Sequence, residues 1–282
     1  SSIFSFSSQK TVFFKNNSAE TANVSADDPG SLTAGTLAIT SLPNPATKLL
    51  LAGAATSNAG NCVSFTVSSQ DAGSVNTSVA SNIAVNLSGI GNGDFYSNAA
   101  CTGGNEITSI QISAGQNTSN TFYFKDTTAE VLTLSASFAG LTTSNLAHTV
   151  NPGTPNNLAL QGAPSLQVGQ CLAYNIEVRD VFNNSSNVGS NTTINITGQA
   201  SGSFYSDSGC SSSITSTSVT SGTNQKTVYF KNNTAETANV TADDAGSLTA
   251  ANFSITTQAS SPTKLLLAGA SSTSAGSCVS FT

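Results

Sequence analysis

Five cysteines are the residues best suited to covalent chemistry in this sequence, and their spacing indicates disulfides. Cys62 and Cys101 are 39 positions apart, and Cys171 and Cys210 are separated by the same interval. Equal spacing in two divergent copies of one segment indicates one disulfide within each copy, which implies an oxidising compartment. Cys278 aligns with Cys62, and its partner is expected to lie outside the given chain. Buried free thiols or a metal pair are the alternatives.

The surroundings of the cysteines indicate where each disulfide lies. Cys171 is out of phase with the apolar residues Leu172, Tyr174 and Ile176 that follow it, and Cys210 follows the turn-like stretch FYSDSG. We therefore expect a peripheral staple between a loop and the start of a strand, rather than a bond through the core. Closing a loop of this length contributes about 4 kcal/mol on the chain-entropy estimate.

Other residues with possible chemistry give weaker signals. His148 is the only histidine and occurs in one copy only, so a Ser–His–Asp triad is not expected. The pairs Asp27–Asp28 and Asp243–Asp244 could offer oxygen ligands to calcium, but the middle copy has Ser137–Phe138 at this place. Solvated turns are the favoured interpretation, with weak calcium binding left open. The sequence predicts no enzyme, no cofactor and no metal site.

These residues belong to a segment that occurs more than once. The stretch from Gln9 to Thr40 returns from Gln225 to Thr256 with 24 of 32 positions identical, and a more divergent copy runs from Thr121 to Val150. Self-similarity at intervals of about a hundred residues is typical of a tandem array of domains.

Period-two alternation of apolar residues predicts an all-β fold for each repeat. It is clear in VSFTV, which begins at Val63, in IAVNL, which begins at Ile83, and in TVYF, which begins at Thr227. About seven such segments, separated by turns rich in Gly, Asn, Ser and Asp, are expected in each repeat of about 108 residues. This number of short strands is typical of an immunoglobulin-like β-sandwich.

Proline-bearing junctions divide the chain into four parts. Residues 1–43 are expected to be the C-terminal part of a truncated repeat, and residues 44–152 and 153–260 complete immunoglobulin-like repeats. Residues 261–282 would then be the N-terminal part of a further truncated repeat. Short linkers with one or two prolines act as semi-rigid spacers, so the units are expected to be held end to end.

The segment VFFKNNSAETANVSA, which begins at Val12, resembles the bacterial immunoglobulin-like repeats of the invasin and intimin kind. The wider pattern, with L-A-G, C-V-S-F, F-Y-S, Y-F-K and T-A in order, is similar to long tandem-repeat surface proteins of Gram-negative bacteria. The resemblance covers all four parts and implies an immunoglobulin-like fold at the cell surface. Invasin-like repeats generally lack the cysteine pair present here.

Aromatic residues out of phase with the core recur at one place in each repeat. If Val12, Phe122 and Val228 point inward, then Phe13, Tyr123 and Tyr229 point outward, and Tyr96 and Tyr205 do likewise. Such a series could form a periodic lateral contact between chains, unless a neighbouring strand or loop covers each ring. Across the following turn we also expect surface ion pairs of a few tenths of a kcal/mol. The pairs would be Lys15–Glu20, Lys125–Glu130 and Lys231–Glu236.

Composition limits the functions that fit. Charged residues make up 8% of the chain, the formal net charge is −6 and no apolar run reaches membrane-spanning length, so neither nucleic-acid binding nor membrane insertion is expected. The sequence predicts a structural extracellular repeat protein that forms a stalk or filament on the cell surface, whose partners are copies of itself. The alternative is an adhesin whose repeats themselves bind a host, prey or neighbouring cell through a cell-surface ligand.

Overall fold

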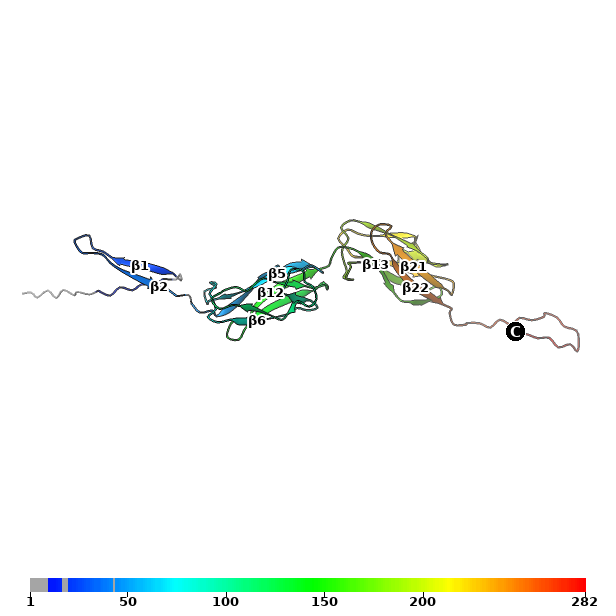
Figure 1. The fold of residues 1–282 in the computed structure, drawn as a ribbon. Coiled ribbons are helices and arrows are strands. Elements are labelled where there is room, and N and C mark those ends of the chain that lie inside the picture. The colour runs from blue at the N-terminus through cyan, green and yellow to red at the C-terminus, as the bar shows by residue number, and fades with distance from the viewer. Residues whose placement is uncertain (1–9, 17–19, 43) are drawn as a thin grey trace, which may run out of the picture. The chain divides into compact units, whose positions relative to one another are not determined.

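The computed structural model describes residues 10–16, 20–42 and 44–282, and every regular element in these ranges is a β-strand (Figure 1). The described residues contain no helix able to span a membrane. The chain divides into two units, Ser1–Asn151 (unit 1) and Pro152–Thr282 (unit 2). Each unit contains one sandwich of two five-stranded sheets, which confirms the all-β, immunoglobulin-like prediction.

In unit 1, one sheet has the order β3-β5-β10-β7-β8 and the other the order β4-β12-β11-β6-β9. Figure 1 labels β5 in the first sheet and β6 and β12 in the second. The strands of the first sheet are β3 (Lys48–Gly53), β5 (Val63–Gln70), β7 (Asp94–Tyr96), β8 (Glu106–Ile107) and β10 (Phe122–Lys125). Those of the second are β4 (Thr56–Asn58), β6 (Ile83–Ser88), β9 (Ser109–Ile112), β11 (Val131–Ser137) and β12 (Ser144–Asn151).

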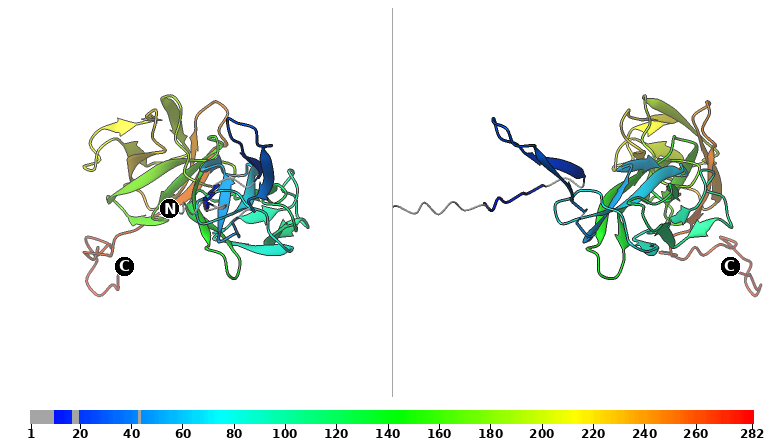
Figure 2. Two further views of the ribbon diagram at one scale, coloured as in Figure 1. Left: turned by 90° about the vertical axis from the view of Figure 1, so that its left-hand side faces the viewer. Right: turned by 60° about the vertical axis from the view of Figure 1, so that its left-hand side comes forward.

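Unit 2 repeats this topology strand for strand, and both sandwiches can be followed in the two views of Figure 2. Its first sheet contains β13 (Asn157–Gly162), β15 (Cys171–Arg179), β17 (Ser203–Tyr205), β18 (Ser213–Ile214) and β20 (Gln225–Lys231). Its second sheet contains β14 (Ser165–Gln167), β16 (Thr192–Thr197), β19 (Ser216–Val219), β21 (Thr237–Asp243) and β22 (Ala251–Gln258). Several of these strands are only two to four residues long, which is why the sequence suggested fewer.

Alternation along the strands builds the core of each sandwich. In β6, Ile83, Val85 and Leu87 are buried while the residues between them are exposed. In β15, Tyr174, Ile176 and Val178 are buried, and Leu172 at the start of the strand is half-buried. Successive side chains of a strand point to opposite faces, so one face of every such strand enters the space between the two sheets.

The second strand of each sandwich, β4 or β14, runs parallel to the last strand, β12 or β22, and is hydrogen-bonded to it. In unit 1, β4 pairs with β12, and the Thr149 N–H donates to the Ala55 carbonyl at 2.9 Å. In unit 2, β14 pairs with β22, and the Val168 N–H donates to the Gln258 carbonyl at 2.9 Å. The remaining strand pairs of both sandwiches are antiparallel.

The segments outside the sandwiches contain little pairing. The strands β1 (Thr21–Ala26) and β2 (Gly35–Thr40) form an antiparallel hairpin. The alternation considered for Val12 and Phe13, with Val12 inward, is not present, because residues 10–16 form no strand and both side chains are exposed. In unit 2 the equivalent strand, β20, is held between β15 and β17, and residues 10–16 pair with no such strands among the described residues.

Candidate functional site

A buried aspartate in each sandwich holds the segment through which the chain enters that sandwich. Asp180 follows the last residue of β15 and is fully buried. Its Oδ1 accepts the N–H groups of Phe182 and Asn184 at 2.8 and 2.9 Å, so it organises the turn after the strand. Its Oδ2 accepts the backbone N–H of Gly153 at 2.7 Å. Gly153 lies in the segment before β13, so the carboxylate ties this entry segment to the sandwich that follows.

Ser186 binds the same entry segment through the other backbone polar group of Gly153, its carbonyl. Its hydroxyl donates to the Gly153 carbonyl at 2.5 Å. Both backbone groups of Gly153 are therefore bound to unit 2. We use the name linker clamp for Asp180 and Ser186 and for their equivalents in unit 1.

Unit 1 has the same clamp 109 positions earlier, at Asp71 and Thr77. The Asp71 Oδ2 accepts the Asn44 side-chain amide at 3.3 Å, and the Thr77 hydroxyl donates to the Asn44 carbonyl at 2.8 Å. Asp71 Oδ1 also accepts the Val75 N–H at 3.0 Å. Each complete repeat thus binds its own entry segment through hydrogen bonds that involve an aspartate and a serine or threonine hydroxyl.

Hydrogen bonding keeps both clamp aspartates ionised. For Asp71, the Val75 N–H is the main cause that lowers the pKa below its ordinary value. For Asp180, burial works in the opposite direction, but the bonds from the Asn184 side chain and from the N–H groups of Gly153, Asn184 and Phe182 outweigh it and lower the pKa. A carboxylate that accepts several N–H groups is stabilised in its charged form.

The cysteines lie where the sequence placed them. Cys62 is bonded to Cys101 and Cys171 to Cys210, with Cα–Cα distances of 5.9 and 6.1 Å, and Cys278 is exposed and unbonded. In unit 2 the bond joins the start of β15 to the loop between β17 and β18, and it passes β20, where Lys231 lies opposite both Cys171 and Ser203. All three strands belong to one sheet, so the disulfide is a peripheral staple along that sheet.

The outward aromatics of the complete repeats lie in pairs on this same sheet. Tyr123 on β10 is opposite Tyr96 on β7, and Tyr229 on β20 is opposite Tyr205 on β17. Tyr123, Tyr205 and Tyr229 are half-buried, and Tyr96 is buried. Burial, together with the carboxylates of Asp94 and Glu106, raises the pKa of Tyr96. A lateral contact through Phe13, Tyr123 and Tyr229 stays a prediction.

His148 belongs to the core of unit 1. It lies on β12, is fully buried, and its ring packs edge-on against Phe65 and Phe124 with centroid distances of 5.7 and 5.4 Å. Its Nδ1 lies 2.7 Å from the Ala54 carbonyl, which can only accept, so Nδ1 carries the hydrogen. Its Nε2 then accepts the hydroxyl of buried Ser57 at 3.0 Å. This Ser–His pair is oriented by a backbone carbonyl rather than by an acid.

Unit 2 satisfies the equivalent carbonyl in a different way. Ile255 stands at the position of His148 and Leu166 at that of Ser57, so two polar residues are replaced by two buried apolar ones. The donor comes instead from Tyr174, which stands at the position of Phe65 and whose hydroxyl donates to the Ala163 carbonyl at 2.8 Å. Around the equivalent carbonyls of Ala54 and Ala163, unit 1 therefore has histidine and phenylalanine where unit 2 has isoleucine and tyrosine.

This difference between the units predicts how much the Tyr174 hydroxyl contributes to the stability of unit 2. A Tyr174→Phe variant leaves the Ala163 carbonyl without its donor, and should lower the free energy of unfolding of unit 2 by about 1–3 kcal/mol. Denaturant unfolding followed by amide signals of unit 2 measures this change. Adding Ile255→His and Leu166→Ser to the variant transfers the arrangement of unit 1 and should recover part of the loss. Unchanged stability of the single variant would contradict the prediction.

The acidic pairs form turns, as the sequence favoured. Asp28 accepts the N–H groups of Gly30 and Leu32 at 3.1 and 3.0 Å, and Asp244 accepts those of Gly246 and Leu248 at 3.0 and 3.3 Å. Within residues 10–16, 20–42 and 44–282, no three His, Cys, Asp or Glu side chains come together as metal ligands.

The expected Lys–Glu ion pairs are wrong for the complete repeats. Glu130 instead accepts the N–H of Asn92 at 2.8 Å, and Glu236 that of Ser201 at 2.8 Å, so both carboxylates bind the turn after β6 or β16. Backbone N–H groups in a turn need acceptors, whereas the ammonium group of a half-buried lysine can reach water at the surface. Among the described residues the one ion pair joins Arg179 to Glu177 at 2.7 Å.

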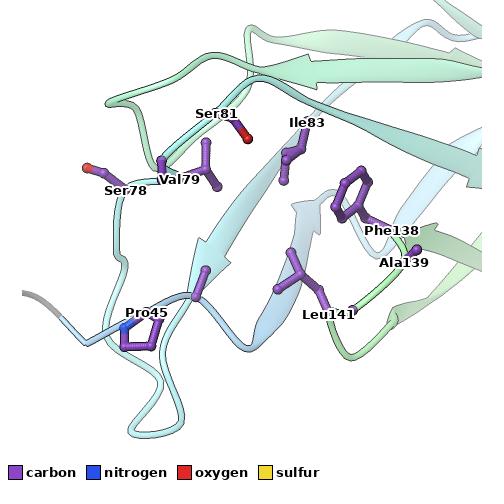
Figure 3. A pocket seen from close by; sticks show the side chains of 11 residues that line it. Pro45, Ser78, Val79, Ser81, Ile83, Phe138, Ala139 and Leu141 are labelled. Carbon is purple, nitrogen blue, oxygen red and sulfur yellow. The ribbon is translucent and has the colours of Figure 1, made fainter.

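Unit 1 also has an apolar pocket of about 280 Å³ at the end of the sandwich where its entry segment arrives (Figure 3). Pro45 lies on one side of it, and Ile83, Phe138 and Leu141 on the other. Phe138 stands where the other repeats have an aspartate, and Thr192 replaces Ile83 in unit 2. Two of the apolar residues that line this pocket are thus polar at the equivalent positions of unit 2.

Comparison with known proteins finds similar solved structures but no match by sequence. No family model matches the chain, and no curated protein matches its sequence. FdeC, an Escherichia coli adhesin, is 12% identical, with 79% of this chain and 68% of that chain covered and a TM-score of 0.35. The D0–D1 domain of intimin is 15% identical over 74% of this chain and 95% of that chain, with a TM-score of 0.26. A β-glycosidase from Bacteroides vulgatus is 10% identical over 74% of this chain but 24% of that chain, with a TM-score of 0.32.

Proposed function

We propose that this chain is a structural segment of an extracellular repeat protein, and that it carries tension as part of a stalk or fibre on the cell surface. The parallel pairing of the second and last strands in each sandwich is the observation that supports this function best. It occurs in unit 1 between β4 and β12 and in unit 2 between β14 and β22.

The geometry of these pairs determines how a pulling force acts. The chain enters a sandwich through its first strand, β3 or β13, reaches the second strand, β4 or β14, after a short turn, and leaves after the last strand. Because the second and last strands are parallel, tension that reaches them from the two ends pulls them in opposite directions along their length. All the hydrogen bonds between them are then loaded together in shear, and none can open before the others. In unit 2 these include the bond from the Thr256 N–H to the Pro164 carbonyl and that from the Val168 N–H to the Gln258 carbonyl, both 2.9 Å.

The disulfides and linker clamps fit the same role. A disulfide limits the length of chain that a unit can release if it opens, and a clamp that holds both backbone groups of Gly153 makes the entry segment part of unit 2. Disulfides of this kind persist in oxidising, extracellular surroundings. The low charge and the small number of titratable groups suit a protein that works as a spacer rather than through reactive chemistry.

Stretching the full chain between its ends in a force spectrometer tests the proposal. Each sandwich should open in one abrupt event at high force. Replacing Cys171 and Cys210 with alanine should lengthen the event of unit 2 by about 13 nm, since 39 more residues become free to extend, and so identifies that event. In this background, Val168→Pro removes the N–H that bonds to Gln258 and should lower the opening force of unit 2 alone.

Unit 1 in the same molecule is the internal control, because its β4–β12 pairing is unchanged. A matched proline at an exposed loop position of unit 2, Ser208→Pro, should leave the force unaltered. A load-bearing role would be refuted if unit 2 opened gradually at low force, or if Val168→Pro left its opening force equal to that of the parent.

A further inference from the structure

The turn between β10 and β11 of unit 1 contains a buried carboxyl group with an unpaired oxygen. Asp126 is only 2% exposed, and its Oδ2 has no hydrogen-bond partner. The residue follows Lys125, the last residue of β10, and Glu130 precedes β11. Orphaned buried polar atoms are uncommon in folded proteins and call for a physical explanation.

The other repeats show which group this position normally holds. At the equivalent place the first repeat has Asn16 and unit 2 has Asn232. The Asn16 Nδ2 donates to Glu20 Oε1 at 3.0 Å, and the Asn232 Nδ2 donates to Glu236 Oε1 at 2.9 Å. In both repeats an amide hydrogen thus bonds a carboxylate four residues later.

The backbone bonds show that Asp126 occupies the same position with the same orientation. Its Oδ1 accepts the Thr128 N–H at 2.7 Å, just as Asn232 Oδ1 accepts the Thr234 N–H at 2.9 Å. The orphaned Oδ2 therefore takes the place of the amide nitrogen that donates to glutamate. Oxygen can serve as a donor to the carboxylate of Glu130 only if it carries a hydrogen.

We propose that Asp126 and Glu130 form a carboxyl–carboxylate pair that shares one proton, held on Asp126 Oδ2, and that its loss at rising pH loosens the β10–β11 turn of unit 1. Glu130 also accepts the Asn92 N–H, so the pair connects this turn to the one after β6. Deprotonation would place two like charges on these turns, with Asp126 buried, and would weaken both connections.

The electrostatic surroundings favour placing the proton on Asp126. Burial raises the pKa of Asp126, and the nearby Glu130 carboxylate raises it further. The Asn92 N–H lowers the pKa of Glu130, which thereby remains the charged partner. Strand β7 contributes Asp94, which lies opposite Lys125 on β10. Residues 59–61, whose Gly60 N–H donates to the Asp126 carbonyl, contain no charged side chain.

The direction of the pH effect follows from the raised pKa. The unfolded chain releases the Asp126 proton at the ordinary pKa of aspartate, whereas the folded chain keeps it to a higher pH. The stabilisation is therefore complete below the ordinary pKa and is lost as pH rises through the folded-state pKa. Asp126→Asn, the residue that the other repeats have, supplies a permanent donor and removes this dependence.

The test compares the full chain with two reciprocal variants, Asp126→Asn and Asn232→Asp. Carbon-13 NMR of the side-chain carboxyl groups should show Asp126 titrating above the ordinary aspartate range. The thermal midpoint of unit 1, followed through its own amide signals, should rise in Asp126→Asn at pH 8 but not at acid pH, by the roughly 4–8 °C that one hydrogen bond moves a domain of this size. Asn232→Asp should give unit 2 the same fall in midpoint with rising pH.

The reciprocal design separates the proposal from a simple change in packing, since both variants conserve shape. An ordinary or lowered titration midpoint for Asp126 would overturn it. So would an Asp126→Asn midpoint that follows the parent at every pH.

Discussion

An Asp180→Ala variant should lower the free energy of unfolding of unit 2 by about 3–5 kcal/mol, which corresponds to a fall in melting temperature of more than about 10 °C. The carboxylate is fully buried and accepts the N–H groups of Phe182, Asn184 and Gly153. Alanine leaves these donors unsatisfied and also releases the entry segment. Thermal unfolding of the full chain, followed through the amide signals of unit 2, measures the loss.

Asp207→Ala is the matched control, because this aspartate also accepts the N–H groups of a turn, those of Gly209, Ser211 and Ser212, but is only partly buried. Water can replace an exposed carboxylate, so its removal should have a much smaller effect. Equal losses for the two variants would contradict the special role of Asp180.

The same aspartate predicts how unit 2 responds to acid. Its pKa is held below the ordinary value, so the unfolded chain takes up the proton at a higher pH than the folded chain does. The contribution is present above the ordinary aspartate pKa, near pH 4, and is lost as pH falls through the lower folded-state value. Asp180→Asn should flatten this part of the stability profile while the parent retains it.

Reduction of the disulfides should have an effect of similar size, about 4 kcal/mol for each unit on the chain-entropy estimate. The loops closed by Cys62–Cys101 and Cys171–Cys210 both span 39 positions, so the two units should lose comparable stability. Melting with and without a reductant measures this in a Cys278→Ser background, which removes the exposed thiol and prevents exchange.

Selective removal of one bond distinguishes the staple from a general effect of the reductant. The double change Cys171→Ser and Cys210→Ser should destabilise unit 2 and leave unit 1 unaltered, whereas Cys278→Ser alone should change neither. Closely similar melting of the oxidised and reduced chains would show that the staple adds nothing to stability.

The comparison of single and reciprocal variants is possible because the chain contains its own controls. Unit 1 and unit 2 share a topology, yet they differ at His148 and Ile255, and at Asp126 and Asn232. Each difference lies in the same backbone environment, so the exchanged side chain is the main variable. The effect of each reciprocal variant can therefore be assigned to the exchanged group.

Much of the architecture could be predicted from the sequence, because it depends on local periodicity. Ile83, Val85 and Leu87 alternate with polar residues, and such a pattern can bury one face only as a strand. The recurrence of the same patterns predicted a tandem array, and the equal intervals between cysteines indicated which thiols lie together. Local alternation failed at Val12, because a strand also needs at least one neighbouring strand to pair with, and the presence of that neighbour is not encoded in the strand's own residues.

The polar interactions were decided only by the tertiary structure. Asp180 and Gly153 are 27 positions apart, and His148 and Ala54 are 94 apart. Neither hydrogen bond could therefore be predicted from the local pattern of apolar and polar residues. Glu130 has Lys125 near it in the sequence, but the fold brings the Asn92 N–H to its carboxylate instead. Sequence alone determined which residues are apolar enough to form the sandwich. Packing of the two sheets determined which backbone groups are removed from water. Those groups need hydrogen-bond partners, and the fold determines which side chains are close enough to supply them.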